Sequence, residues 1–173
     1  MRFLLVYGTT EGQTRKIAAF CETRLTEAGY AVDMRDSSRR MPDLDIASYD
    51  AVILAASVHQ KTHQESLTDF ALAHRAQLLA RPTLLISVSL SIAFENGETE
   101  AEKYVQGFID DTGFTPTKVA LVAGALRYDE YDYYMSQIVE YVVLESRGKV
   151  EGDHEFTDWD ALAKTLDDFT ASV

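Results

Sequence analysis

Five apolar runs separated by segments of helical periodicity constrain the fold of this 173-residue chain more than any other feature. Each run is continuous, which is typical of parallel strands whose two faces are both buried. The expected strands are Arg2–Tyr7, Tyr30–Arg35, Ala51–Ala56, Thr83–Ser89 and Lys118–Ala123. Strands that alternate with helices connect by right-handed crossovers, so the pattern predicts an α/β fold, a doubly wound five-stranded parallel sheet with helices on both faces.

The segments between the strands carry apolar residues at helical spacing. The expected helices are Gln13–Ala28, Glu65–Leu79, Glu98–Asp111, a segment around Tyr131–Arg147, and a last helix that Thr157 caps, with Asp160 at its third position. No linker divides the chain, and its length suits a single domain over residues 1–173.

A turn rich in glycine and threonine joins the first strand to the first helix. It reads Gly8-Thr9-Thr10-Glu11-Gly12-Gln13-Thr14 and aims backbone N–H groups, hydroxyls and a helix N-terminus at one point. It has neither the lysine of a Walker loop nor the three spaced glycines of a dinucleotide fingerprint. A neutral cradle of this kind suits one phosphate monoester, most commonly that of flavin mononucleotide (FMN). The alternative is a capped turn that binds nothing.

A phosphate loop after the first strand favours the strand order 2-1-3-4-5, with the ligand outside the carboxyl ends of strands one and three. Loops after strands three and four should then hold the flat, apolar ring of a flavin. We expect the Glu11 side chain to point away from the phosphate while its N–H faces it. The predicted cofactor-binding residues are Thr9, Thr10, Glu11, Gly12, Gln13, Thr14, Ser57, Val58, His59, Gln60, Ser89, Leu90, Ser91, Ile92, Gly124, Ala125 and Leu126.

Four residues that could titrate or bind metal have simpler interpretations. Cys21 shares the apolar face of the first helix with Ile17 and Leu25, which predicts a small core residue. We expect His63 to be a solvent-exposed residue at a helix start and His74 an ordinary helix-face histidine. His59 is either such a residue or a proton donor at the flavin edge. No diagnostic spacing of ligands predicts a metal site.

The charge balance excludes one class of partner. Sixteen Lys and Arg residues face 28 Asp and Glu residues, a formal charge of −12. Such acidity argues against nucleic-acid binding and disfavours docking on anionic membranes. The apolar runs are too short to span a bilayer, and the first residues do not read as a secretory leader. We therefore expect a cytoplasmic protein with at most a weak peripheral contact with the inner membrane.

Four motifs carry a resemblance to a known family. They are Glu11-Gly12-Gln13-Thr14, Gly124-Ala125-Leu126-Arg127-Tyr128, the tyrosines Tyr131, Tyr133 and Tyr134, and Phe156-Thr157-Asp158-Trp159. The first resembles the phosphate loop of flavodoxins. Together, in this order, they resemble the flavodoxin-like, menaquinone-dependent protoporphyrinogen oxidases of bacteria.

The resemblance implies an FMN-dependent oxidoreductase of haem biosynthesis. Its partners would be a protoporphyrinogen-like substrate and a quinone or other acceptor, and Arg127, Tyr128 and His59 would be the candidates for substrate contact. The chain departs from this family at residues 129–145, which are acidic where the relatives are basic. The alternatives are a flavodoxin-like electron carrier that docks redox partners through an acidic face, and a binding domain without cofactor. No oligomeric state is predicted.

Overall fold

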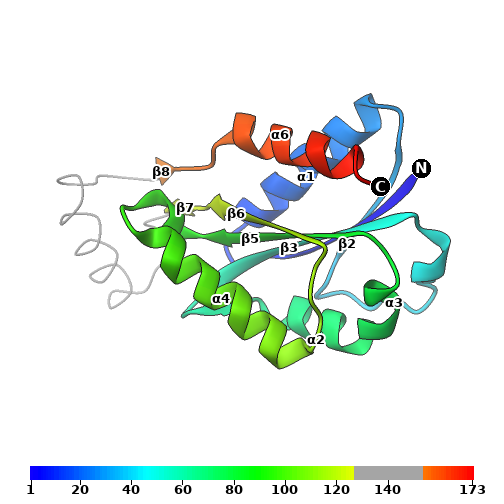
Figure 1. Cartoon of the computed structure of the whole chain (residues 1–173), viewed down its shortest axis with the longest axis horizontal. Helices are drawn as coiled ribbons and strands as arrows, with labels where there is room; N and C mark the ends of the chain where they lie inside the picture. The colour runs from blue at the N-terminus through cyan, green and yellow to red at the C-terminus, as the bar shows by residue number, and fades with distance from the viewer. Residues whose placement is uncertain (127–153) are drawn as a thin grey trace.

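The computed structural model describes residues 1–126 and 154–173. At its centre lies a parallel sheet in the order β2-β1-β3-β5-β6 (Figure 1). Its strands are β1 (Arg2–Gly8), β2 (Ala31–Asp36), β3 (Ala51–His59), β5 (Thr83–Ser89) and β6 (Lys118–Ala123). The short β4 (Thr62–His63) only pairs antiparallel with the end of β3. The order along the five long strands is therefore the predicted 2-1-3-4-5, and the predicted α/β class is confirmed.

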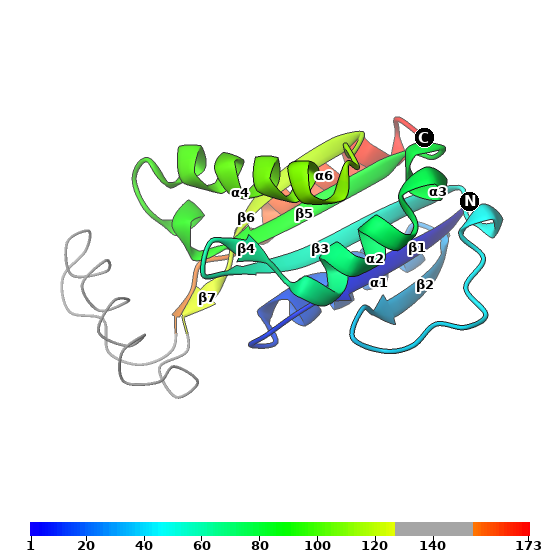
Figure 2. The ribbon, with the colours of Figure 1, turned by 90° about the horizontal axis from the view of Figure 1, so that it is seen from below.

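Helices cover both faces of the sheet. On one face lie α1 (Gln13–Glu27) and α6 (Trp159–Thr170) (Figure 1). On the other lie α2 (Glu65–Ala73), α3 (Arg75–Leu79) and α4 (Gly97–Thr112), with α2 and α4 side by side (Figure 2). The remaining elements are the 3₁₀ turns η1 (Ile46–Ser48) and η2 (Leu90–Ala93) and the two-stranded β7 (Ala125–Leu126) and β8 (His154–Glu155). The helix expected around Tyr131–Arg147 lies outside the described residues.

Two cores flank the sheet because the strands direct apolar side chains toward the helices on both faces. The core under α1 and α6 includes Phe3, Leu5, Ile17, Cys21 and Leu166. The core under α2 and α4 includes Leu4, Val6, Leu54, Leu67 and Phe108. Burial confirms Cys21 as a core residue and raises the pKa of its thiol to about 12. Such a thiol stays protonated and unreactive.

Three local expectations were wrong. The strands β2 and β6 are not buried on both faces, because they are the two edge strands of the sheet and include exposed residues. The helix expected over Glu65–Leu79 is two helices that meet at His74, whose φ of −109° leaves the helical range and whose ring packs on Phe70 at 4.6 Å. The N-cap of α6 is Asp158, not Thr157, since the Asp158 carboxylate accepts from the Ala161 N–H at 2.9 Å.

Candidate functional site

A cleft opens at the carboxyl ends of the central strands, where α1 begins. Its lining consists of Thr9, Thr10, Glu11, Gln13, Thr14, Ser57, Val58, His59, Val88, Ser89, Leu90, Gly124 and Ala125. All of these except Val88 are among the residues predicted from the sequence to bind a cofactor. The fold therefore brings together the three predicted loops, and their cofactor role stays a prediction.

Five predicted residues do not line this cleft. Gly12 shapes the loop beneath it, and Gln60 occupies the β3–β4 turn with φ of 49°. The Ser91 hydroxyl contacts the Tyr104 hydroxyl at 3.3 Å, away from the cleft. Ile92 lines a separate groove beside β6. Leu126 is buried in β7.

The loop between β1 and α1 leaves a helix N-terminus available to a ligand. Gly12 precedes α1 with φ of 91°, a conformation that favours glycine, and its N–H donates to Thr9 Oγ1 at 2.9 Å. No side chain caps α1, and its first turn holds no acidic residue. The first N–H groups and the positive end of the helix dipole can therefore serve an anion.

Four buried side-chain atoms around the cleft lack a hydrogen-bond partner in the described structure. They are Gln13 Oε1, Thr14 Oγ1, Ser57 Oγ and Ser89 Oγ. Buried polar atoms are normally hydrogen-bonded, and an unsatisfied one costs about 1–3 kcal/mol. Their gathering on one cleft, at the end of three strands and a helix, indicates a polar ligand that completes these bonds.

Glu11 does not point outward as expected. Its carboxylate is mostly shielded and faces His59 across the cleft, with Glu11 Oε1 3.9 Å from His59 Nδ1. The side chain turns inward because β1 and β3 are neighbours, so the loops that follow them meet. His59 thus lies on the cleft and not on a remote helix start.

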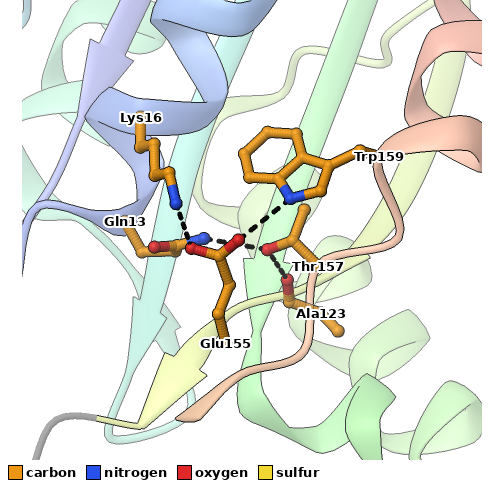
Figure 3. Close-up of polar contacts among 6 residues, drawn as sticks. All are labelled: Gln13, Lys16, Ala123, Glu155, Thr157 and Trp159. Carbon is orange, nitrogen blue, oxygen red and sulfur yellow. Dashed lines mark hydrogen bonds and ion pairs between the residues drawn. The ribbon is translucent and has the colours of Figure 1, made fainter. Parts of the chain in front are cut away.

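A polar network ties the start of α1 to the segment after β8 (Figure 3). The Thr157 hydroxyl donates to the Ala123 carbonyl at 2.7 Å and accepts from Gln13 Nε2 at 2.9 Å. Because the only hydroxyl proton of Thr157 is used by Ala123, the Gln13 amide must be the donor, and this sets its orientation. Gln13 Oε1 is therefore the unpartnered acceptor in the cleft.

Glu155 completes this network from β8. Its carboxylate pairs with Lys16 and accepts from Trp159 Nε1 at 2.9 Å. The hydrogen bond from Lys16 is the largest cause that lowers the pKa of Glu155, and burial opposes it. The sequence singled out Phe156–Trp159 only as a motif. The sequence alone could not show that Thr157 contacts Gln13, because the two residues are 144 positions apart and meet only in the folded chain.

His63 is buried and not exposed, contrary to expectation. Its Nε2 lies 2.8 Å from Ser87 Oγ, its ring packs on Phe108, and only 7% of the residue is exposed. The burial arises because β4 folds back on β3 beneath α4. Desolvation lowers its pKa to about 4, so the imidazole is neutral at pH 7. His74 is an ordinary helix-end histidine whose Nδ1 lies 2.9 Å from Gln77 Oε1.

The remaining predicted contacts, Arg127 and Tyr128, lie outside the described residues, as does the acidic segment 129–145. Within residues 1–126 and 154–173, no cluster of metal-ligating side chains is found. The helices of the same two ranges include none that is long and apolar enough to cross a bilayer.

Comparison with known proteins shows which family the chain belongs to. Residues 4–153 match the family described as flavodoxin domain. The chain belongs to the flavodoxin domain family. A protein from Escherichia coli K12 named protoporphyrinogen IX dehydrogenase (quinone) is 28% identical over 94% of this chain and 91% of its own length. A protein of the same name from Leishmania major is 25% identical over 97% of this chain and 74% of its own length. These relatives confirm the resemblance drawn from the four motifs.

Solved flavodoxins share the fold. A short-chain flavodoxin associated with a bacterial microcompartment superposes with a TM-score of 0.60 at 16% identity, over 99% of this chain and 98% of its own. The Fusobacterium nucleatum flavodoxin bound to flavin mononucleotide gives a TM-score of 0.52 at 15% identity, over 99% of this chain and 95% of its own. At such identities the likeness establishes the flavodoxin fold.

Proposed function

We propose that the cleft binds FMN and that the chain is an FMN-dependent protoporphyrinogen IX dehydrogenase with a quinone acceptor. The main support for a bound cofactor is the group of four unpartnered polar atoms beside an uncapped helix N-terminus. The names of the relatives support the substrate and the acceptor.

The donors and acceptors of the cleft suit different parts of FMN. The Thr9 hydroxyl accepts from the Gly12 N–H, so its own proton remains available for a phosphate oxygen. The Thr14 hydroxyl has no partner and can also donate its proton to the phosphate. The Thr10 hydroxyl instead donates to Gln64 Oε1 at 2.8 Å, so its proton is already used. Gln13 Oε1 can only accept, which suits a hydroxyl of the sugar chain better than a phosphate.

The other side of the cleft suits the ring. Ser57, Val58, Ser89 and Leu90 offer apolar surface and hydroxyls at the ends of β3 and β5. Bound FMN supplies the redox chemistry, because flavins accept a hydride equivalent and return electrons singly or in pairs. The protein has only to bind the substrate over the ring, exclude water and accept a proton. His59, at the mouth of the cleft and 38% exposed, is the proposed proton acceptor.

Arg127 remains the proposed partner of a substrate propionate, through a bidentate charge-assisted pair. Arg127→Ala should then raise the Michaelis constant more than it lowers turnover. We also propose a cytoplasmic location with at most a weak peripheral membrane contact.

The test is anaerobic mixing of the FMN-loaded protein with protoporphyrinogen IX. The protein is kept in excess, because the conversion to porphyrin releases six electrons and each flavin accepts two. We expect the flavin absorbance to bleach while porphyrin fluorescence rises, and a quinone to restore the flavin bands. A colourless protein that takes up no FMN would contradict the whole proposal.

A second function is favoured by the formal charge of −12. An electron carrier with an acidic surface associates quickly with basic redox partners. The same experiment separates the two: bound flavin that protoporphyrinogen does not bleach, yet that a basic reductase reduces, would identify the chain as a carrier.

A further inference from the structure

A second pocket opens at the carboxyl end of the edge strand β2. It has a volume of about 300 Å³, and four of its lining residues are Arg15, Arg35, Arg39 and Arg40. It shares no lining residue with the cleft at the start of α1. Asp36 is the single acidic residue of its lining. We call it the arginine pocket.

The charges of the arginine pocket are largely unpaired. Arg35 forms an ion pair with Asp33 at 2.8 Å. By contrast, the side chains of Arg15, Arg39 and Arg40 form no ion pair within residues 1–126 and 154–173. The Asp36 carboxylate accepts from the N–H and hydroxyl of Ser38 at 2.9 and 2.7 Å.

Many basic side chains of the described residues form no ion pair, but Arg15, Arg39 and Arg40 line the same pocket, beside a single acidic residue. Elsewhere Arg24 pairs with Asp167 at 2.6 Å and Lys103 with Glu100 at 3.0 Å. Guanidinium groups gathered around one pocket repel one another unless an anion lies between them.

The residues around the arginines indicate the kind of anion. A guanidinium group presents a planar fork of donors that matches phosphate and carboxylate oxygens in pairs. The pocket wall also includes Tyr7, Met34 and Met41, which offer apolar and polarisable contacts to a ring. Met34 and Met41 are only partly buried against the two cores, and a bare inorganic anion would leave their exposed parts in water.

We propose that the arginine pocket binds a small phosphate ester with an aromatic body, of the size of a nucleoside monophosphate. The phosphate meets Arg15, Arg39 and Arg40, and the body lies on the methionines. This site is independent of the FMN cleft, so it needs neither the proposed cofactor nor the proposed reaction.

The experiment is calorimetric titration of the purified, FMN-saturated protein with AMP, with inorganic phosphate and with adenosine. We expect AMP to bind more tightly than phosphate and adenosine hardly at all. Arg39→Gln and Arg40→Gln should each weaken AMP about tenfold or more, as expected for loss of a charge-assisted hydrogen bond. Lys103→Gln removes an equal charge on α4 and should leave the affinity for AMP unchanged. FMN affinity should stay constant in all three variants.

Three results would overturn the proposal. The first is no AMP binding at millimolar concentration in low salt. The second is an equal loss in Lys103→Gln and the arginine variants, which would show only a non-specific response to net charge. The third is arginine-dependent co-sedimentation with phosphatidylglycerol vesicles without any AMP binding, which would assign the arginines to a lipid surface.

Discussion

Thr14 offers a test in which stability and affinity should change in opposite directions. It is 1% exposed, and its hydroxyl has no partner in the described structure. Valine has nearly the same shape and the same branching at Cβ, so Thr14→Val removes the hydroxyl and leaves the packing of α1 nearly intact. A residue that serves only the fold would not show such opposite changes.

The magnitudes follow from the two environments of the hydroxyl. Without ligand, the buried hydroxyl has lost water and gained no bond, a penalty of about 1–3 kcal/mol that valine removes. With ligand, the hydroxyl donates to an ionised phosphate, and losing that bond costs about 1.5–3 kcal/mol, or about ten- to hundredfold in dissociation constant. The apoprotein should therefore unfold at higher urea concentration, and FMN should bind more weakly.

Thr112 is the matched control on α4. It is equally buried, but its hydroxyl donates to Phe108 O at 2.7 Å and accepts from Phe114 N–H at 3.2 Å. Thr112→Val should destabilise the apoprotein by about 1–3 kcal/mol and leave FMN affinity unchanged. Urea denaturation of the apoproteins and quenching of flavin fluorescence measure both quantities. The reasoning is refuted if Thr14→Val binds FMN as the unmodified chain does, or if it destabilises the apoprotein.

Three further perturbations test other parts of the structure. The pKa of His63 falls from 6.5 in the unfolded chain to about 4 in the folded one, so the unfolded chain binds the extra proton as the pH falls. The free energy of unfolding should therefore drop by up to about 3 kcal/mol between pH 6.5 and 4. Urea midpoints should show this drop, and His63→Gln should flatten it. Asp158→Ala should lower the free energy of unfolding by about 1 kcal/mol because it removes the cap of α6. Thr157→Ala should keep that cap but weaken FMN binding, because the Gln13 side chain loses its partner. Equal effects of the two variants on melting temperature and on FMN affinity would contradict this assignment. Gly12→Ala should lower the free energy of unfolding by about 1–2 kcal/mol, because a φ of 91° strains any residue with a Cβ. The strain comes from the backbone alone, since no atom lies within 4 Å of the added Cβ. An unchanged melting temperature would contradict this expectation.

The sequence by itself determined the architecture and the place of the cleft. Continuous apolar runs mark the strands of a covered parallel sheet, so the bounds of Thr83–Ser89 and Lys118–Ala123 were predicted to the residue, although the second is a partly exposed edge strand. Because parallel strands end at one edge, the loops after them had to meet. Most of the cleft lining therefore followed from topology alone. Glycine at position 12 and the hydroxyls around it were visible as a local pattern.

The tertiary structure decided what each side chain does. Whether His63 is exposed depends on β4 folding beneath α4, and whether Glu11 points outward depends on the neighbouring loop that carries His59. The pairing of Gln13 with Thr157 joins residues far apart in the chain. Periodicity records which face of an element is apolar, but burial, pKa and hydrogen bonding of polar groups depend on what another element brings to that face.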